Sequence, residues 1–92
     1  MTNKIISAVC EYFGITPETL QSKTRKHNIV YARQVAIYFK RRQGMTANAI
    51  ANIIGLNNHT TILYSERIIN NYLSYDRAVQ EDIDNITQIL NR

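Results

Sequence analysis

Hydrophobic residues recur at helical spacing along nearly the whole chain. Ile5, Val9 and Phe13 lie four positions apart and predict an amphipathic helix over residues 3–13. No segment alternates convincingly between apolar and polar residues as a half-buried strand does. The spacing predicts further helices over about residues 17–20, 30–42, 47–54 and 59–73, and a last helix after Asp76. The chain is therefore expected to be all-α, with five or six helices.

The residues between these segments are typical of helix ends. Gly14 ends the first helix, and Thr16-Pro17-Glu18 begins the second with a capping hydroxyl, a proline at the first helical position and an acid in the first turn. The polar run Gln21–Asn28 predicts a loop. Gln43-Gly44 closes the third helix, and Thr46 is expected to cap the helix that follows. These signals place every expected helix within one domain that covers residues 1–92.

The most informative stretch is the pair of helices broken near Gly55. Its apolar face is expected to consist of Ile50, Ile53, Ile54 and Leu56, followed by Ile62, Ile68 and Ile69. Asn58 is expected to cap the second helix, and His59, Thr60 and Thr61 then occupy its first turn. Unpaired N–H donors and short polar side chains at such a helix end can reach base edges. The pattern predicts a helix-turn-helix that binds double-stranded DNA. An ordinary αα-hairpin in a helical bundle, with exposed polar residues, is the alternative.

Charge is divided unevenly between the two halves of the sequence. Residues 1–45 carry eight lysines and arginines against two acids, whereas residues 46–92 carry three against five. Between Lys23 and Arg42 there are seven cations and no acid. Such a patch favours a phosphate backbone because binding releases counterions. The alternative is a solvated basic face that only keeps the protein soluble.

Composition narrows the remaining classes of protein. With one cysteine, Cys10, an internal disulfide is impossible, and only two histidines are present, which argues against a structural zinc site. No apolar run has the length of a membrane span, and the N-terminus does not resemble a signal peptide. Neither a phosphate-binding loop for a nucleotide nor a catalytic constellation is present. The sequence therefore predicts a cytoplasmic protein that is no enzyme and needs no cofactor.

Three blocks of sequence resemble the C-terminal DNA-binding domain of the bacterial replication initiator DnaA. They are EYFGITPETLQSKTRK, YARQVAIYFKRR and IIGLNNHTTILYSERI, in the order of that family. The resemblance implies a helical domain related to the Trp-repressor type. It also implies binding to the DnaA box, with the second helix of the hairpin in the major groove and a basic loop in the minor groove.

The same resemblance assigns roles to individual residues. Arg25 matches the loop arginine that enters the minor groove, where an A·T-rich sequence strengthens the negative potential. The pairs Arg33 with Lys40 and Gln34 with Arg41 lie seven positions apart, and we expect them to line a phosphate backbone. The complete set of predicted DNA-binding residues is Arg25, Lys26, Arg33, Gln34, Lys40, Arg41, Asn58, His59, Thr60 and Thr61.

Three features depart from the family. Asn58 stands where an aspartate is usual, Gly55-Leu56-Asn57 replaces the usual Gly-Gly-Arg, and the loop around Gln43–Met45 looks about one residue short. The initiator also carries an ATPase module before this domain, and the Met1 start favours a free-standing form. A free-standing domain is expected to bind replication origins, or to act as a competitor or transcriptional regulator. The rival hypothesis is a protein-interaction module that binds the initiator itself or another acidic partner.

Overall fold

A computed structural model describes residues 4–54 and 59–92 of the chain. Within these residues it contains six helices and no strand. The helices are α1 (Lys4–Phe13), α2 (Pro17–Leu20), α3 (His27–Arg42), α4 (Ala47–Ile54), α5 (His59–Leu73) and α6 (Arg77–Asn91). The all-α prediction is confirmed.

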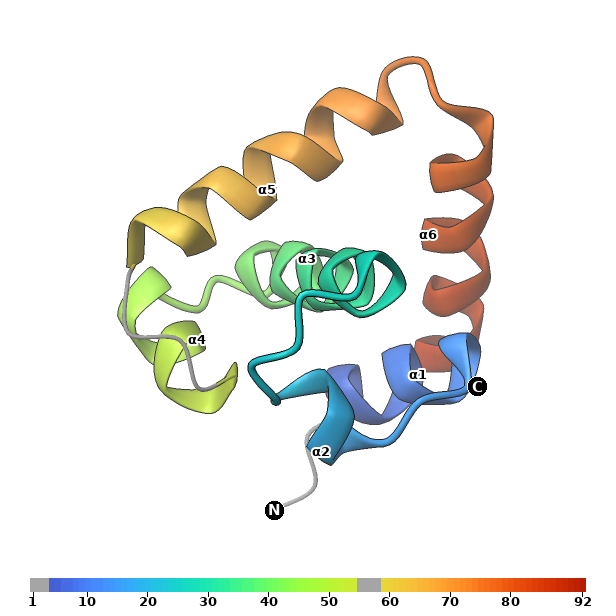
Figure 1. Ribbon diagram of the computed structural model, residues 1–92. Coiled ribbons are helices and arrows are strands. Elements are labelled where there is room, and N and C mark those ends of the chain that lie inside the picture. The colour runs from blue at the N-terminus through green and yellow to red at the C-terminus, as the bar shows by residue number, and fades with distance from the viewer. Residues whose placement is uncertain (1–3, 55–58) are drawn as a thin grey trace.

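Helix α3 lies at the centre of the domain. In Figure 1 it is surrounded by α5 above, α4 at the left, α6 at the right, and α1 with α2 below. Helices α1, α2, α4 and α5 all pack on α3, while α6 packs on α1 and α5. Because α3 has neighbours on most sides, Val35–Lys40 are six consecutive buried residues.

The core consists of aliphatic side chains from all six helices. Its fully buried members are Val9, Leu20, Ala32, Val35, Ala36, Ile50, Ile62, Ile69 and Ile86. Removal of this apolar surface from water is the main favourable term in folding. Cys10 belongs to the same cluster, and burial raises the pKa of its thiol, which disfavours the reactive thiolate.

Most predicted helix ends are confirmed by their hydrogen bonds. The Thr16 hydroxyl accepts from the Thr19 N–H at 3.1 Å, and the Thr46 hydroxyl accepts from the Ala49 N–H at 3.2 Å. Asp76 caps α6 by accepting from the backbone N–H groups of the second and third residues of that helix, at 3.0 and 3.3 Å. Gly14 and Gly44 have φ of +69° and +89°, a conformation that other residues rarely adopt.

One predicted boundary is wrong. The sequence predicted a loop through Asn28 and a helix from about Val30, but α3 begins at His27. The N–H groups of Ile29 and Val30 donate to the Lys26 carbonyl at 3.0 and 2.9 Å. Ile29 is buried against the domain, so tertiary packing extends the helix into a polar stretch of sequence.

A partly buried carboxylate joins three helices. Asp82 of α6 accepts hydrogen bonds from the hydroxyls of Tyr12 of α1 at 2.6 Å and Tyr31 of α3 at 2.8 Å. Desolvation, and then the hydrogen bond to Asp82, raise the pKa of Tyr31. Tyr31 thus packs against the core, and its hydroxyl also holds α6 in place.

Candidate nucleic-acid interface

The two helices of the predicted helix-turn-helix pack as expected. Ile50 and Ala51 of α4 and Ile62 of α5 are buried, which confirms the apolar face of the hairpin. The turn at residues 55–58, including the capping role and base contact expected of Asn58, lies outside the described residues. His59 is the first residue of α5, and its side chain also lies outside the description.

The first turns of α5 border a groove shared with α3. Thr60 and Thr61 are exposed, as predicted. Side chains from both helices line a cavity of about 230 Å³, namely Val30, Arg33, Gln34, Ile37, Thr61, Tyr64 and Ser65. The predicted residues Arg33 and Gln34 of α3 therefore lie together with Thr61 of α5, from a separate part of the sequence.

Tyr64 is a further candidate contact residue that was not predicted from the sequence. Its side chain lines the same groove and is 54% exposed. A large aromatic side chain so accessible is available for contact with a ligand. The signal was present, because Tyr64 lies four positions after Thr60 and three after Thr61, the spacing that places residues on one helix face.

The basic loop before α3 is accessible and is bonded to the groove. Arg25 and Lys26 are exposed, as their predicted role requires. Arg33 connects the two parts, since it lines the groove and its Nη2 donates to the carbonyl of Thr24 at 3.1 Å, next to Arg25. Desolvation lowers the pKa of the Arg33 guanidinium. The Arg33 guanidinium is therefore partly buried and bonded to backbone carbonyls, and it is not a freely exposed cation.

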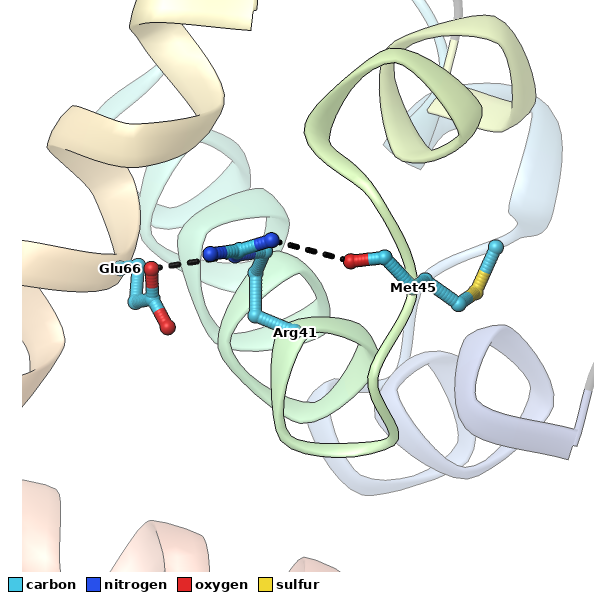
Figure 2. A network of polar contacts seen from close by, with 3 residues as sticks. All are labelled: Arg41, Met45 and Glu66. Atoms are coloured by element: carbon cyan, nitrogen blue, oxygen red, sulfur yellow. Dashed lines mark hydrogen bonds and ion pairs between the residues drawn. The ribbon is translucent and has the colours of Figure 1, made fainter.

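Arg41 is also engaged within the protein. Its Nε donates to the Glu66 carboxylate of α5 at 3.1 Å, and its Nη1 donates to the Met45 carbonyl at 3.1 Å (Figure 2). The Arg41 and Glu66 side chains are 28% and 29% exposed, so part of each remains accessible. Arg41 thereby ties α3 to α5 and to the loop that enters α4.

The prediction that Lys40 lines a phosphate backbone is not supported by its position in the fold. It was expected to share an open helix face with Arg33, but it is 2% exposed, and desolvation lowers the pKa of its ammonium group. The reason is that α3 is packed on most sides, so a seven-residue spacing does not define a free face. A side chain enclosed in this way does not line a phosphate backbone, and we leave Lys40 out of the proposed interface.

Replacement of Lys40 tests this correction. Lys40→Met is expected to leave the salt dependence of DNA binding unchanged, whereas loss of a phosphate contact would reduce the slope by about 0.9. At neutral pH the melting temperature of Lys40→Met is expected to be higher than that of the wild type, since burial of a charged ammonium costs free energy. Because the pKa of Lys40 is lower in the folded protein than in the unfolded chain, the charged ammonium destabilises the folded state at pH values below the folded-state pKa. This cost disappears above the lysine pKa of the unfolded chain, about 10.4, where the group is neutral in both states. The difference between the two proteins should therefore close as pH approaches 10.4; a less stable variant at neutral pH contradicts this account.

Over residues 4–54 and 59–92, no three His, Cys, Asp or Glu side chains gather in a way that could hold a metal ion. Among the same residues, no helix combines the length and the apolar character needed to cross a membrane.

Comparison with known proteins agrees with this arrangement. Residues 2–69, which include the hairpin and the basic loop, match the family described as bacterial dnaA protein helix-turn-helix. The chain belongs to this family. Membership makes it a DNA-binding helix-turn-helix domain of the DnaA type. Helix α6 lies beyond the matched residues.

Similar proteins from several bacteria support the assignment. The chromosomal replication initiator protein DnaA of Flavobacterium psychrophilum is 37% identical over 89 residues, which cover 94% of this chain and 18% of that protein. The proteins of the same name from Bacteroides fragilis and Corynebacterium jeikeium are 30% and 32% identical and cover 96% and 91% of the chain. The chain spans 19% and 15% of their lengths.

Proposed function

We propose that the chain binds double-stranded DNA with sequence specificity at a site like the DnaA box. The observation that carries this proposal is the juxtaposition of the recognition helix and the basic loop. Arg33 and Gln34 line a groove with Thr61 of α5, and Arg33 bonds the loop that carries Arg25 and Lys26. Helix α5, which suits the major groove of DNA, and the basic loop, which suits the adjacent minor groove, therefore lie side by side in the protein.

The two parts are suited to different grooves. The exposed first turn of α5 carries Thr60 and Thr61, whose methyl groups can contact the thymine 5-methyl group in the major groove. Arg25 is exposed in the loop and suits a narrow, A·T-rich minor groove. Contacts of Lys26 and Gln34 with phosphates would set the register and carry no sequence information. Asn58 and His59 stay in the proposal on the grounds of family resemblance alone.

The biological consequence follows from occupancy of the site. We propose that the chain binds replication-origin DNA in the cytoplasm, and that the 92-residue chain by itself competes with a DnaA initiator for its boxes or regulates transcription at promoters that contain them. A gel-shift competition between the chain and a full DnaA protein on one origin duplex tests the competitor role. Simultaneous binding of both proteins to a single box contradicts it.

Selection of bound duplexes from a random pool tests the function directly. The expected result is one enriched motif similar to the DnaA box, and a duplex with that motif scrambled serves as the control. If about four phosphates are neutralised, log K against log salt should have a slope of about −3 to −4. Equal affinity for all duplexes, or binding that does not depend on salt, contradicts the proposal and favours the protein-interaction alternative.

A further inference from the structure

The Arg33 side chain holds the basic loop through three hydrogen bonds. Its Nε donates to the Leu20 carbonyl at 2.7 Å, and its Nη2 donates to the carbonyls of Ser22 at 2.7 Å and Thr24 at 3.1 Å. Leu20 is the last residue of α2 and is fully buried, whereas Ser22 and Thr24 precede Arg25 in the loop. We call these three bonds the Arg33 clamp.

An arginine suits the position of residue 33 better than a lysine would. The carbonyls at a helix C-terminus lack intrahelical partners and carry partial negative charge, which a cation neutralises. A guanidinium presents five N–H donors in a rigid plane and can bond several carbonyls from one fixed position. A lysine keeps the charge but cannot reproduce the fork. The clamp therefore depends on shape as well as on charge.

The rest of the loop is held by weaker local bonds. The Thr24 and Lys26 N–H groups donate to the Ser22 and Thr24 hydroxyls at 3.4 and 3.3 Å, and these contacts are exposed. The Ser22 hydroxyl donates to the Thr19 carbonyl at 2.7 Å. Each of these bonds joins residues that are only two or three positions apart. The hydrogen bonds from Arg33, in contrast, join Ser22 and Thr24 of this loop to the central helix α3.

We propose that Arg33 is a positioning residue that orders the loop before DNA arrives, so that Arg25 and Lys26 are presented to the duplex. This inference rests on the proposed function. A flexible loop loses conformational freedom when it binds, and prior order removes that cost from the affinity. A direct bond from Nε or Nη2 of Arg33 to a phosphate would require release of the carbonyls that these atoms now bond.

Two substitutions separate positioning from phosphate contact. Arg33→Lys keeps the charge and Arg33→Gln removes it, but neither reproduces the clamp. If Arg33 positions the loop, both variants should weaken binding to the selected duplex by about tenfold, the equivalent of ordering about one residue. If Arg33 serves only as a phosphate contact, the lysine variant should bind like wild type and the glutamine variant alone should lose affinity.

A double-mutant cycle with Arg25 shows whether Arg33 acts through the loop. In the Arg25→Ala background, Arg33→Lys should cost clearly less than in the wild-type background, because only Lys26 is then left to position. Equal losses in both backgrounds overturn the proposal. Arg42→Lys is the matched control, since Arg42 lies on the same helix and bonds the Tyr38 hydroxyl instead of the loop. It should leave affinity unchanged.

Hydrogen exchange in the free protein gives a readout that does not require DNA. In Arg33→Lys, the Thr24 and Lys26 amides should exchange faster while the α5 and α6 amides keep their rates. Faster exchange throughout the domain would mean global destabilisation and would overturn the local role. If wild type binds duplex but Arg33→Lys binds equally well, the inference alone fails. If wild type binds no selected duplex, the proposed function fails and the inference falls with it.

Discussion

Ile62→Ala is expected to lower the free energy of unfolding by about 2–5 kcal/mol, the largest loss of stability that we predict. Ile62 is fully buried on α5, between the exposed Thr61 and Leu63. Truncation removes three carbon atoms from the core and leaves a cavity that the packed helices cannot fill. Small domains have only about 5–15 kcal/mol of stability in total. Urea denaturation followed by circular dichroism measures the change.

The neighbouring residue supplies the control. Leu63 is an aliphatic side chain on the same helix, but it is 39% exposed. Leu63→Ala should cost less than about 1 kcal/mol, since much of its surface is in water in the folded state already. Similar losses for the two variants would mean that α5 is packed differently from the arrangement in Figure 1.

Arg25→Ala is expected to weaken binding to the selected A·T-containing duplex by about 1–3 kcal/mol, or about 5- to 150-fold. Arg25 is exposed in the loop beside the groove, so its loss should remove a minor-groove contact without disturbing the core. Fluorescence anisotropy with labelled duplex measures the affinity. The melting temperature of the free protein should stay within about a degree of wild type, because surface substitutions rarely change stability.

Lys4→Ala is the matched control for charge. Lys4 is an exposed cation at the start of α1, where it borders a cavity together with Arg92 and residues of α6, away from the groove. It should reduce affinity by less than about twofold. Equal and small effects of the two substitutions would remove the minor-groove loop from the proposed interface, while a DNA-binding role for α5 would still stand.

Local rules of sequence explain why the helices and their ends were predictable. Thr16, Thr46 and Asp76 each cap a helix with their own side chain, and Gly14 and Gly44 adopt a backbone conformation that glycine tolerates. These interactions involve residues no more than three or four positions apart. The apolar spacing likewise assigned Ile50, Ile62 and Ile69 to the core before any tertiary contact was known.

Tertiary structure decided which polar residues of α3 are accessible. The sequence does not distinguish Arg33, Lys40 and Arg41, because all three are cationic residues on the same long helix. The fold gives them different surroundings: loop carbonyls for Arg33, burial for Lys40 and the Glu66 carboxylate for Arg41. These surroundings come from segments far along the chain, so helical periodicity could not reveal them.

The sequence by itself determined the all-α class, the helix-turn-helix and the exposure of Thr60, Thr61 and Arg25, because these depend on local propensity, capping and polarity. Only the tertiary structure placed Arg33 between the groove and the basic loop, because that contact joins α3 to the end of α2. It also decided that Lys40 belongs to the interior. The surroundings of Arg33 and Lys40 both depend on which helices pack around α3. That packing is determined only when the apolar surfaces of all the helices are buried together.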